Sequence, residues 1–100
     1  MSAVMQRLNG MRLTSIDRGT EGDVSLKFEK CVLAAYNPWR ALPRLEELVG
    51  RRVESIQSNG DRLTINFGDG AIFSISLASC DYRGPEAFSA SFDGGPIVVE

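Results

Sequence analysis

The sequence predicts a mainly β protein, borderline with the α+β class. We expect seven to eight short antiparallel strands that meander through a sandwich or a partly open barrel. Three observations predict this class. Apolar and polar residues alternate in several short segments, turn dipeptides separate those segments, and two parts of the chain match each other at an offset of about 40 residues.

The internal match consists of two blocks. Residues 8–16 align with residues 48–56, where leucine, glycine, arginine, serine and isoleucine coincide. After a one-residue gap, residues 24–28 align with residues 63–67. Two blocks in the same order indicate a duplicated unit.

The duplication sets the expected domain organisation. The 100 residues are the size of one ordinary domain, so we expect a single domain over residues 1–100. Its pseudo-repeat units span about 8–43 and 48–86, and a C-terminal hairpin spans 87–99.

The strands of each unit follow from side-chain alternation. Residues 24–28, 63–67 and 73–77 alternate between apolar and polar side chains, the pattern of a sheet with one solvated face. The first strand of each unit is less regular. In the first unit its apolar residues Leu13 and Ile16 lie three apart, which indicates a bulge or burial on both faces.

Turn dipeptides predict which strands are neighbours. Asn-Gly at 59–60 and Asp-Gly at 69–70 tolerate the positive φ angles of tight hairpins. Asp-Gly-Gly at 93–95 is expected to join a strand at 87–92 to a strand at 97–99. These turns predict antiparallel pairing.

One short helix is expected near residues 43–49. Pro43 suits a first helical turn, good helix formers follow it, and Gly50 can end the helix. Leu45 and Leu48 would form part of an apolar stripe that lies on the sheet.

The composition argues against several classes of function. The net charge of −2 does not favour nucleic acid as a partner, and no segment has the length of a signal peptide or a membrane span. The absence of histidine removes the commonest general base and transition-metal ligand, so we expect no metal and no cofactor. Cys31 and Cys80 are interpreted as reduced thiols of a cytoplasmic protein.

The strongest polar cluster is Asp81-Tyr82-Arg83, directly after Cys80. In a catalytic interpretation Asp81 is a base, Tyr82 a proton donor and Arg83 an anion clamp. In a structural interpretation Arg83 ties a corner to a carboxylate or a backbone carbonyl, and Tyr82 covers the edge of the core. We favour the structural interpretation, and whether the protein is an enzyme stays open with a preference for no.

A binding hypothesis uses the third, shorter match between the units. If a pseudo-two-fold axis relates them, Trp39-Arg40 and Tyr82-Arg83 lie at equivalent corners. Aromatic and arginine side chains are enriched at binding hot spots, so a groove lined by these four residues could bind an acidic peptide or a partner surface. The alternative is that Trp39 closes one end of the core.

The C-terminal residues 96–100 support a second binding hypothesis. They are rich in β-branched residues and contain no lysine. At a sheet edge they could extend a partner's sheet or form a symmetric dimer. The alternative is an ordinary paired last strand.

Several segments resemble a group of small bacterial proteins of unknown function. The similarity lies in Asn-Pro-Trp-Arg at 37–40, Leu-Glu-Glu-Leu-Val-Gly at 45–50 and Phe-Gly-Asp-Gly at 67–70, and it covers roughly residues 8–77. The resemblance implies a bacterial origin and a two-unit architecture, and no activity or cofactor. The sequence contains nine arginines and only two lysines, and this ratio also favours a bacterial source.

The function predicted from the sequence is a protein-binding module that recognises an unknown partner or a second copy of itself. The alternative is a small-molecule-binding protein or minor enzyme with a pocket between the two repeats. That pocket would use Asp81, Tyr82, Arg83 and Cys80.

Overall fold

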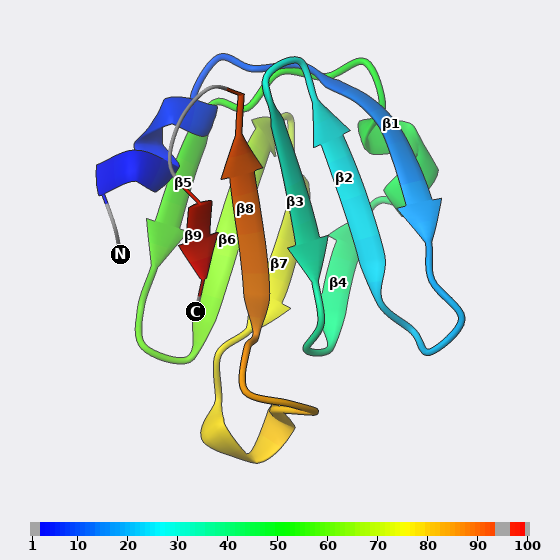
Figure 1. The fold of residues 1–100 in the computed structure, drawn as a ribbon. Helices are drawn as coiled ribbons and strands as arrows, with labels where there is room; N and C mark the ends of the chain where they lie inside the picture. Colours follow the sequence, from blue (N-terminus) through cyan, green and yellow to red (C-terminus); the bar gives the residue numbers. More distant parts are fainter. Residues whose placement is uncertain (1–2, 94–96, 100) are drawn as a thin grey trace.

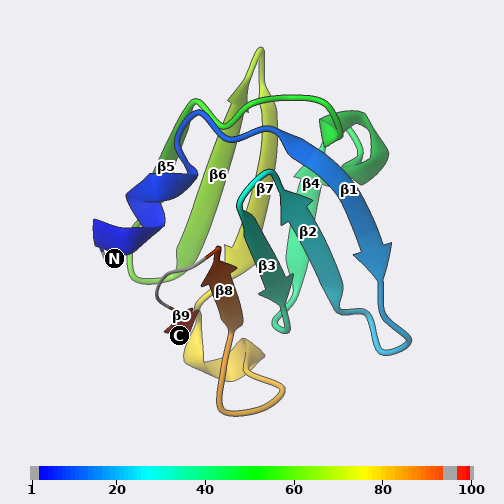
Figure 2. The same cartoon turned by 45° about the horizontal axis from the view of Figure 1, so that its top comes forward.

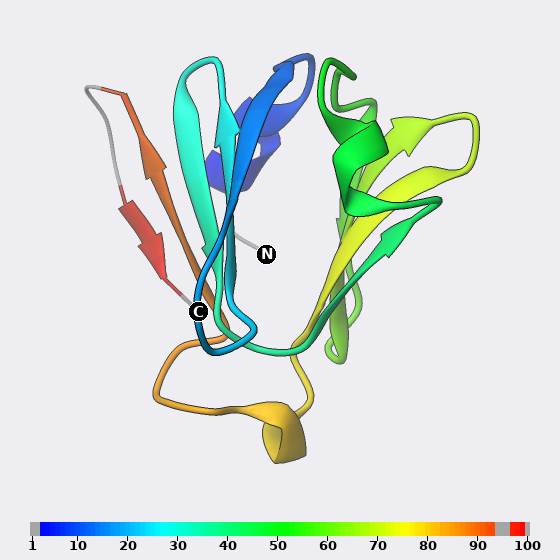
Figure 3. The same ribbon diagram turned by 90° about the vertical axis from the view of Figure 1, so that its right-hand side faces the viewer.

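The computed structural model describes residues 3–93 and 97–99. These residues form nine strands in two antiparallel sheets that face each other as an open sandwich (Figures 1 and 3). The prediction of a mainly β fold is confirmed, with one strand more than the expected seven to eight. The strands are β1 (Leu13–Arg18), β2 (Val24–Phe28), β3 (Cys31–Ala35), β4 (Trp39–Leu42), β5 (Ser55–Ser58), β6 (Arg62–Gly68), β7 (Ala71–Ser76), β8 (Phe88–Phe92) and β9 (Ile97–Val99).

The two sheets are built by the same sequence of connections. One sheet has the order β1-β2-β3-β8-β9 and the other the order β4-β7-β6-β5. In each half of the chain three consecutive strands form a meander, and the fourth strand crosses to the opposite sheet. Figure 3 shows both crossings at the lower end of the sandwich. The exchanged strands β4 and β8 therefore join each half to the other.

A second junction lies at the opposite end, where the segments before β1 and β5 run side by side (Figure 2). Arg12 and Arg52 form an isolated antiparallel bridge there. Four backbone hydrogen bonds surround the bridge, and they form two equivalent pairs. The two bonds of a pair join the same positions of the internal match, with the roles of the two segments exchanged. We call the four bonds the crossing ladder: Gly10 N–H to Val53 O (2.8 Å), Gly50 N–H to Leu13 O (2.7 Å), Leu13 N–H to Arg51 O (2.9 Å) and Val53 N–H to Met11 O (2.9 Å).

The expected helix at residues 43–49 is wrong. Only Leu45–Leu48 is helical, as the 3₁₀ turn η2. The residues on either side of this turn are extended, Arg44 with φ −155° and Val49 with φ −62° and ψ 131°. Four residues between two extended neighbours cannot form the i to i+4 hydrogen bonds of a longer α-helix.

A further 3₁₀ turn, η1 (Ala3–Leu8), was not predicted from the sequence. It packs beside β5, while η2 packs against β7 on the other side of the molecule, and its Glu46 forms an ion pair with Arg18 of β1 (Figure 1). Leu8 and Leu48, which the internal match aligns, are both fully buried. The two turns therefore fill the open sides of the sandwich. None of the helical segments in the described residues has the length and apolar character of a membrane span.

Turns are present at both predicted positions that the structure describes, although three residues, 59–61, separate β5 from β6 and only Gly60 of the Asn-Gly pair has a positive φ. Of the two alternatives for the first strand, the structure shows the bulge. Asp69 and Gly70 have φ angles of 54° and 80°, the left-handed conformation of a tight hairpin between β6 and β7. Asn59 joins β5 to β6 and accepts two backbone hydrogen bonds of 3.0 Å through its side chain. The pairing of β1 with β2 shifts register between Leu13 and Ser15.

The last predicted turn, Asp-Gly-Gly at 93–95, lies largely outside the described residues. The strands on either side of it, β8 and β9, pair antiparallel as expected. The internal duplication stays a prediction, with which the matched sheet connections are consistent.

Glu29 forms charged contacts with Arg12 and Arg52, which form the bridge inside the crossing ladder, and these contacts should make the free energy of unfolding depend on pH. The Glu29 carboxylate accepts the Arg12 backbone N–H at 3.0 Å, and its oxygens lie 3.8 Å and 3.5 Å from the guanidinium groups of Arg12 and Arg52. The backbone hydrogen bond from Arg12, followed by the charge of Arg52, lowers the pKa of Glu29. A lowered pKa in the folded state stabilises the fold above the unfolded-state pKa, and that stabilisation is lost as the pH falls.

We therefore predict that Glu29→Gln lowers the free energy of unfolding at neutral pH. The difference from the wild type should shrink as the pH falls below about 4, where the carboxyl of the unfolded chain takes up its proton. Urea unfolding between pH 3 and 7 measures this difference. A constant difference over the whole range would contradict the charged role of Glu29.

Candidate functional site

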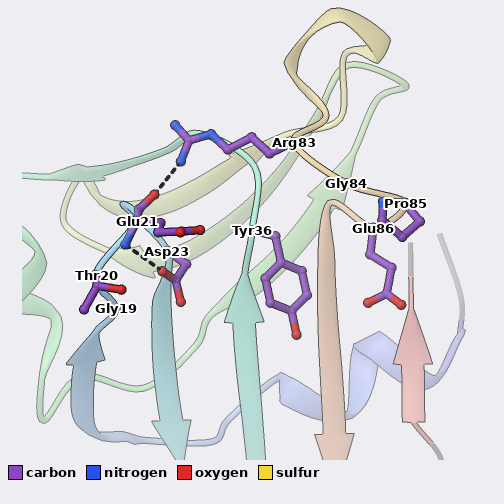
Figure 4. Close-up of a pocket in the computed structure, with 9 residues that line it drawn as sticks. All are labelled: Gly19, Thr20, Glu21, Asp23, Tyr36, Arg83, Gly84, Pro85 and Glu86. Carbon is purple, nitrogen blue, oxygen red and sulfur yellow. Dashed lines mark hydrogen bonds between the residues drawn. The ribbon is translucent and has the colours of Figure 1, made fainter.

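A cavity of about 750 Å³ is lined by segments that lie at the end of the sandwich opposite the crossing ladder, the lower end in Figure 1. Three segments meet around it: the β1–β2 loop, the residue after β3, and the connection that precedes β8 (Figure 4). Both predicted units contribute to the wall. The residues that line the cavity are Gly19, Thr20, Glu21, Asp23, Tyr36, Arg83, Gly84, Pro85 and Glu86.

The β1–β2 loop holds its shape through contacts of its own. The Gly19 N–H donates to the Asp23 carbonyl at 2.9 Å, and the Glu21 N–H donates to the Asp23 carboxylate at 3.4 Å. A Cβ atom placed on Gly19 would lie 2.1 Å from the Asp23 carboxylate. A larger residue at position 19 would therefore displace the Asp23 side chain, which folds back over the loop.

Trp39 holds the same loop from the opposite sheet. Its indole N–H donates to the Gly22 carbonyl at 2.8 Å. Its ring stacks on Phe73 at 5.6 Å between centroids, and the Arg18 guanidinium lies 5.8 Å from the ring centroid. Trp39 is half-buried and packs on the core. These contacts favour the interpretation that Trp39 closes one end of the core.

Arg83 holds the loop from the third segment. Its Nη1 donates to the Glu21 carbonyl at 2.9 Å, a link between residues 62 positions apart (Figure 4). This is the backbone-carbonyl tie expected from the structural interpretation of Arg83. Since Arg83 also lines the cavity, it both shapes the loop and faces the site.

The residues that precede Arg83 in the sequence do not join it at the cavity. Asp81 accepts a hydrogen bond from the Ser76 hydroxyl, and the Cys80 thiol lies 3.9 Å from the other Asp81 oxygen. Tyr82 is 38% exposed and is not among the lining residues. The weak catalytic candidates Asp81, Tyr82 and Arg83 are therefore not brought together around one reaction centre.

The four predicted binding residues occupy different surroundings. Trp39 begins β4 and faces the core, whereas Arg40 is exposed on the same strand, opposite Ser74 of β7. Tyr82 and Arg83 lie in the connection between the 3₁₀ turn η3 (Ser79–Asp81) and β8. Since β8, and not this connection, corresponds to β4 in the sheet order, the two aromatic–arginine pairs do not occupy equivalent positions.

The cavity is acidic. Its wall carries the carboxylates of Glu21, Asp23 and Glu86 and a single guanidinium, that of Arg83. Among the described residues these three carboxylates take part in no ion pair. Tyr36 lies between the acidic side chains in Figure 4, and the residue is 36% exposed. Its hydroxyl lies 3.1 Å from the Ser89 hydroxyl.

Sequence reasoning missed most of this site. One segment could have indicated the site: Gly-Thr-Glu-Gly-Asp at 19–23 places two acidic residues and two glycines between two predicted strands. Tyr36 and Glu86 have no local signal, because only the fold brings them to this loop. Within the part of the chain that the structure describes, no group of three acidic or thiol side chains is placed to hold a metal ion.

Comparisons with protein-family models, with curated proteins and with solved structures find no match to this chain. The resemblance to small bacterial proteins accordingly stays a prediction. The site must be interpreted from its own geometry.

The two cysteines should differ in reactivity. Both are free thiols, Cys31 buried at the start of β3 and Cys80 exposed in η3 at the other end of the molecule. Burial, with a smaller contribution from the charge of Asp93, raises the pKa of Cys31 to about 12. The reactive thiolate is therefore scarce at Cys31 near neutral pH.

We predict that a thiol reagent such as DTNB modifies only Cys80 in the folded protein at pH 8. Cys31 should react only after denaturation. The Cys80→Ser variant supplies the control, because it should stay unlabelled while folded. Rapid labelling of that folded variant would show that Cys31 is not buried as described.

Proposed function

We propose that this protein is an interaction module that binds a positively charged segment of a partner protein in the cavity beside the β1–β2 loop. The observation that carries the proposal is the acidic wall of Glu21, Asp23 and Glu86 around the exposed ring of Tyr36. A cleft lined by one sign of charge concentrates ligands of the opposite sign. This basic ligand is opposite in charge to the acidic peptide that was proposed from the sequence for a groove lined by Arg40 and Arg83.

The wall supplies the groups that recognise a lysine or arginine side chain. Carboxylates form charge-assisted hydrogen bonds with ammonium and guanidinium groups, and guanidinium binding is often bidentate. The exposed face of an aromatic ring such as Tyr36 adds a cation–π contact. Together these groups favour a cation that lies over Tyr36 with the carboxylates of Glu21, Asp23 and Glu86 around it.

Trp39 and Arg83 have a positioning role in this proposal. Their hydrogen bonds to Gly22 and Glu21 hold the loop that carries the acidic side chains. Since the Arg83 guanidinium donates to a backbone carbonyl, its contact leaves the Glu21 carboxylate available to a ligand. Two of the four predicted binding residues, Trp39 and Arg83, thus hold the loop of the site, and Arg83 also lines the cavity.

The size of the cavity favours a second candidate, a small cationic metabolite. Ligand pockets for small molecules are commonly about 300–1,000 Å³, and the volume of about 750 Å³ falls in that range. The recognition chemistry is the same as for a basic side chain. Free amines and basic peptides must therefore be compared directly.

The test is fluorescence anisotropy with labelled hexa-arginine, using hexaglutamate as the negative control. We expect wild-type protein to bind hexa-arginine and to lose affinity as salt is added, because the contacts are ionic. The Glu21→Gln/Glu86→Gln variant should bind at least about tenfold more weakly, since a hydrogen bond to a charged group contributes about 1.5–3 kcal/mol.

The matched control is Glu54→Gln/Asp69→Asn, which also removes two carboxylates, one before β5 and one in the β6–β7 turn, at the other end of the sandwich. It should bind hexa-arginine as the wild type does. Equal weakening by both variants would show attraction to net charge and would contradict the site. Competition by free arginine or spermidine as effective as that of the peptide would favour the small-molecule candidate.

We also propose that the protein acts in the bacterial cytoplasm. The nine arginines against two lysines support the bacterial origin. The two free thiols are consistent with a reducing compartment.

A further inference from the structure

The two sheets have four edge strands, β1 and β9 in one sheet and β4 and β5 in the other. An edge strand presents unpaired backbone N–H and C=O groups that another chain can bind. Proteins usually block such edges with charges, prolines, bulges or covering segments. The four edges of this protein differ in how far they are blocked.

Three of the edges carry such devices. The pairing of β1 with β2 contains the register shift after Leu13, and Arg18 of β1 forms an ion pair with Glu46 of η2. The β4 edge carries the charged Arg40 within the strand. The β5 edge is packed against η1 (Figures 1 and 2).

The β9 edge carries none of these devices along its own length. Ile97–Val99 consists of three β-branched residues without a charge, and it pairs with β8 in a regular register. Val98 is buried, whereas Ile97 is 67% exposed, the highest value for a large apolar side chain among the described residues. An uncharged, exposed edge of this kind is a template for strand addition.

We propose that β9 pairs antiparallel with β9 of a second copy, so that two five-stranded sheets become one continuous sheet. An antiparallel strand can pair with itself about a two-fold axis, which makes the contact closed and self-complementary. With the axis at Val98, Ile97 is placed opposite Val99 of the second copy. No charge within the strand opposes an identical partner.

This surface is separate from the acidic cavity. The cavity is lined by residues 19–23, Tyr36 and residues 83–86, none of which belongs to β9. Dimerisation and ligand binding can therefore be tested and can fail independently.

The test is analytical ultracentrifugation of wild type and two variants over a wide range of protein concentration. We expect the wild-type mass to rise towards twice that of the monomer, because a three-residue strand forms a weak dimer. Ile97→Lys places a charge on the edge strand, a common natural block to strand addition, and should remain monomeric. Circular dichroism checks that each variant is folded.

Val32→Lys is the matched control. Val32 is 42% exposed and lies on the same cross-strand row as Ile97, because Val32 pairs with Ser91 and Ser91 pairs with Ile97. It belongs to the interior strand β3, so this variant should still dimerise. Dissociation of Val32→Lys as well would show association through the face of the sheet and would overturn the proposal.

Hydrogen exchange supplies a second readout that does not depend on a variant. Amide protons of residues 97–99 should exchange several-fold more slowly at high than at low wild-type concentration. A wild-type protein that stays monomeric at millimolar concentration, or unchanged exchange in β9, would overturn the proposal.

Discussion

The crossing ladder around Arg12 and Arg52 is the interaction on which the rest of the structure depends. Its four backbone hydrogen bonds tie the segment before β1 to the segment before β5. Leu13 and Val53 are buried, and the four bonds pair the backbone N–H and C=O groups of both residues. The ladder therefore sets where both meanders begin and where η1 and η2 enter the core.

At the opposite end the two halves are joined by strand exchange. The backbone N–H groups of Tyr36 and Asn37 both donate to the Ala87 carbonyl, at 2.8 and 3.0 Å, and the Ser76 N–H donates to the Pro38 carbonyl at 2.9 Å. The buried Asn37 side chain also donates to the Ser76 carbonyl at 2.8 Å. These hydrogen bonds join the connection before β4 to the connection before β8, and the cavity opens beside them.

Much of the fold follows from local signals in the sequence. Alternation in residues 24–28 and 63–67 predicted β2 and β6, and Asp69-Gly70 predicted the tight turn between β6 and β7. The spacing of Leu13 and Ile16 left two alternatives, a bulge or burial on both faces, and the structure shows the bulge. The helix near 43–49 failed because its residues are good helix formers locally, whereas the flanking chain is held extended. Tertiary context overrode propensity there.

The site could not be predicted in the same way. It needs the β1–β2 loop, Tyr36 and residues 83–86 to meet, and the bond from Arg83 to Glu21 spans 62 positions. The internal match paired Trp39-Arg40 with Tyr82-Arg83, but the chain reaches β8 only after a longer connection, so the two pairs diverge in place. Contacts between residues so far apart in the sequence produce no local pattern from which they could be predicted.

The central claim is that the crossing ladder joins the two sheets into one cooperative unit. Native-state hydrogen exchange of the Gly10, Leu13, Gly50 and Val53 amides tests it most directly, read beside a central amide such as Ile65. The account predicts that all five exchange only through global unfolding, with the same free energy and the same dependence on denaturant. Faster, denaturant-independent exchange of the four ladder amides would contradict it, because the ladder would then open while the sheets stay folded.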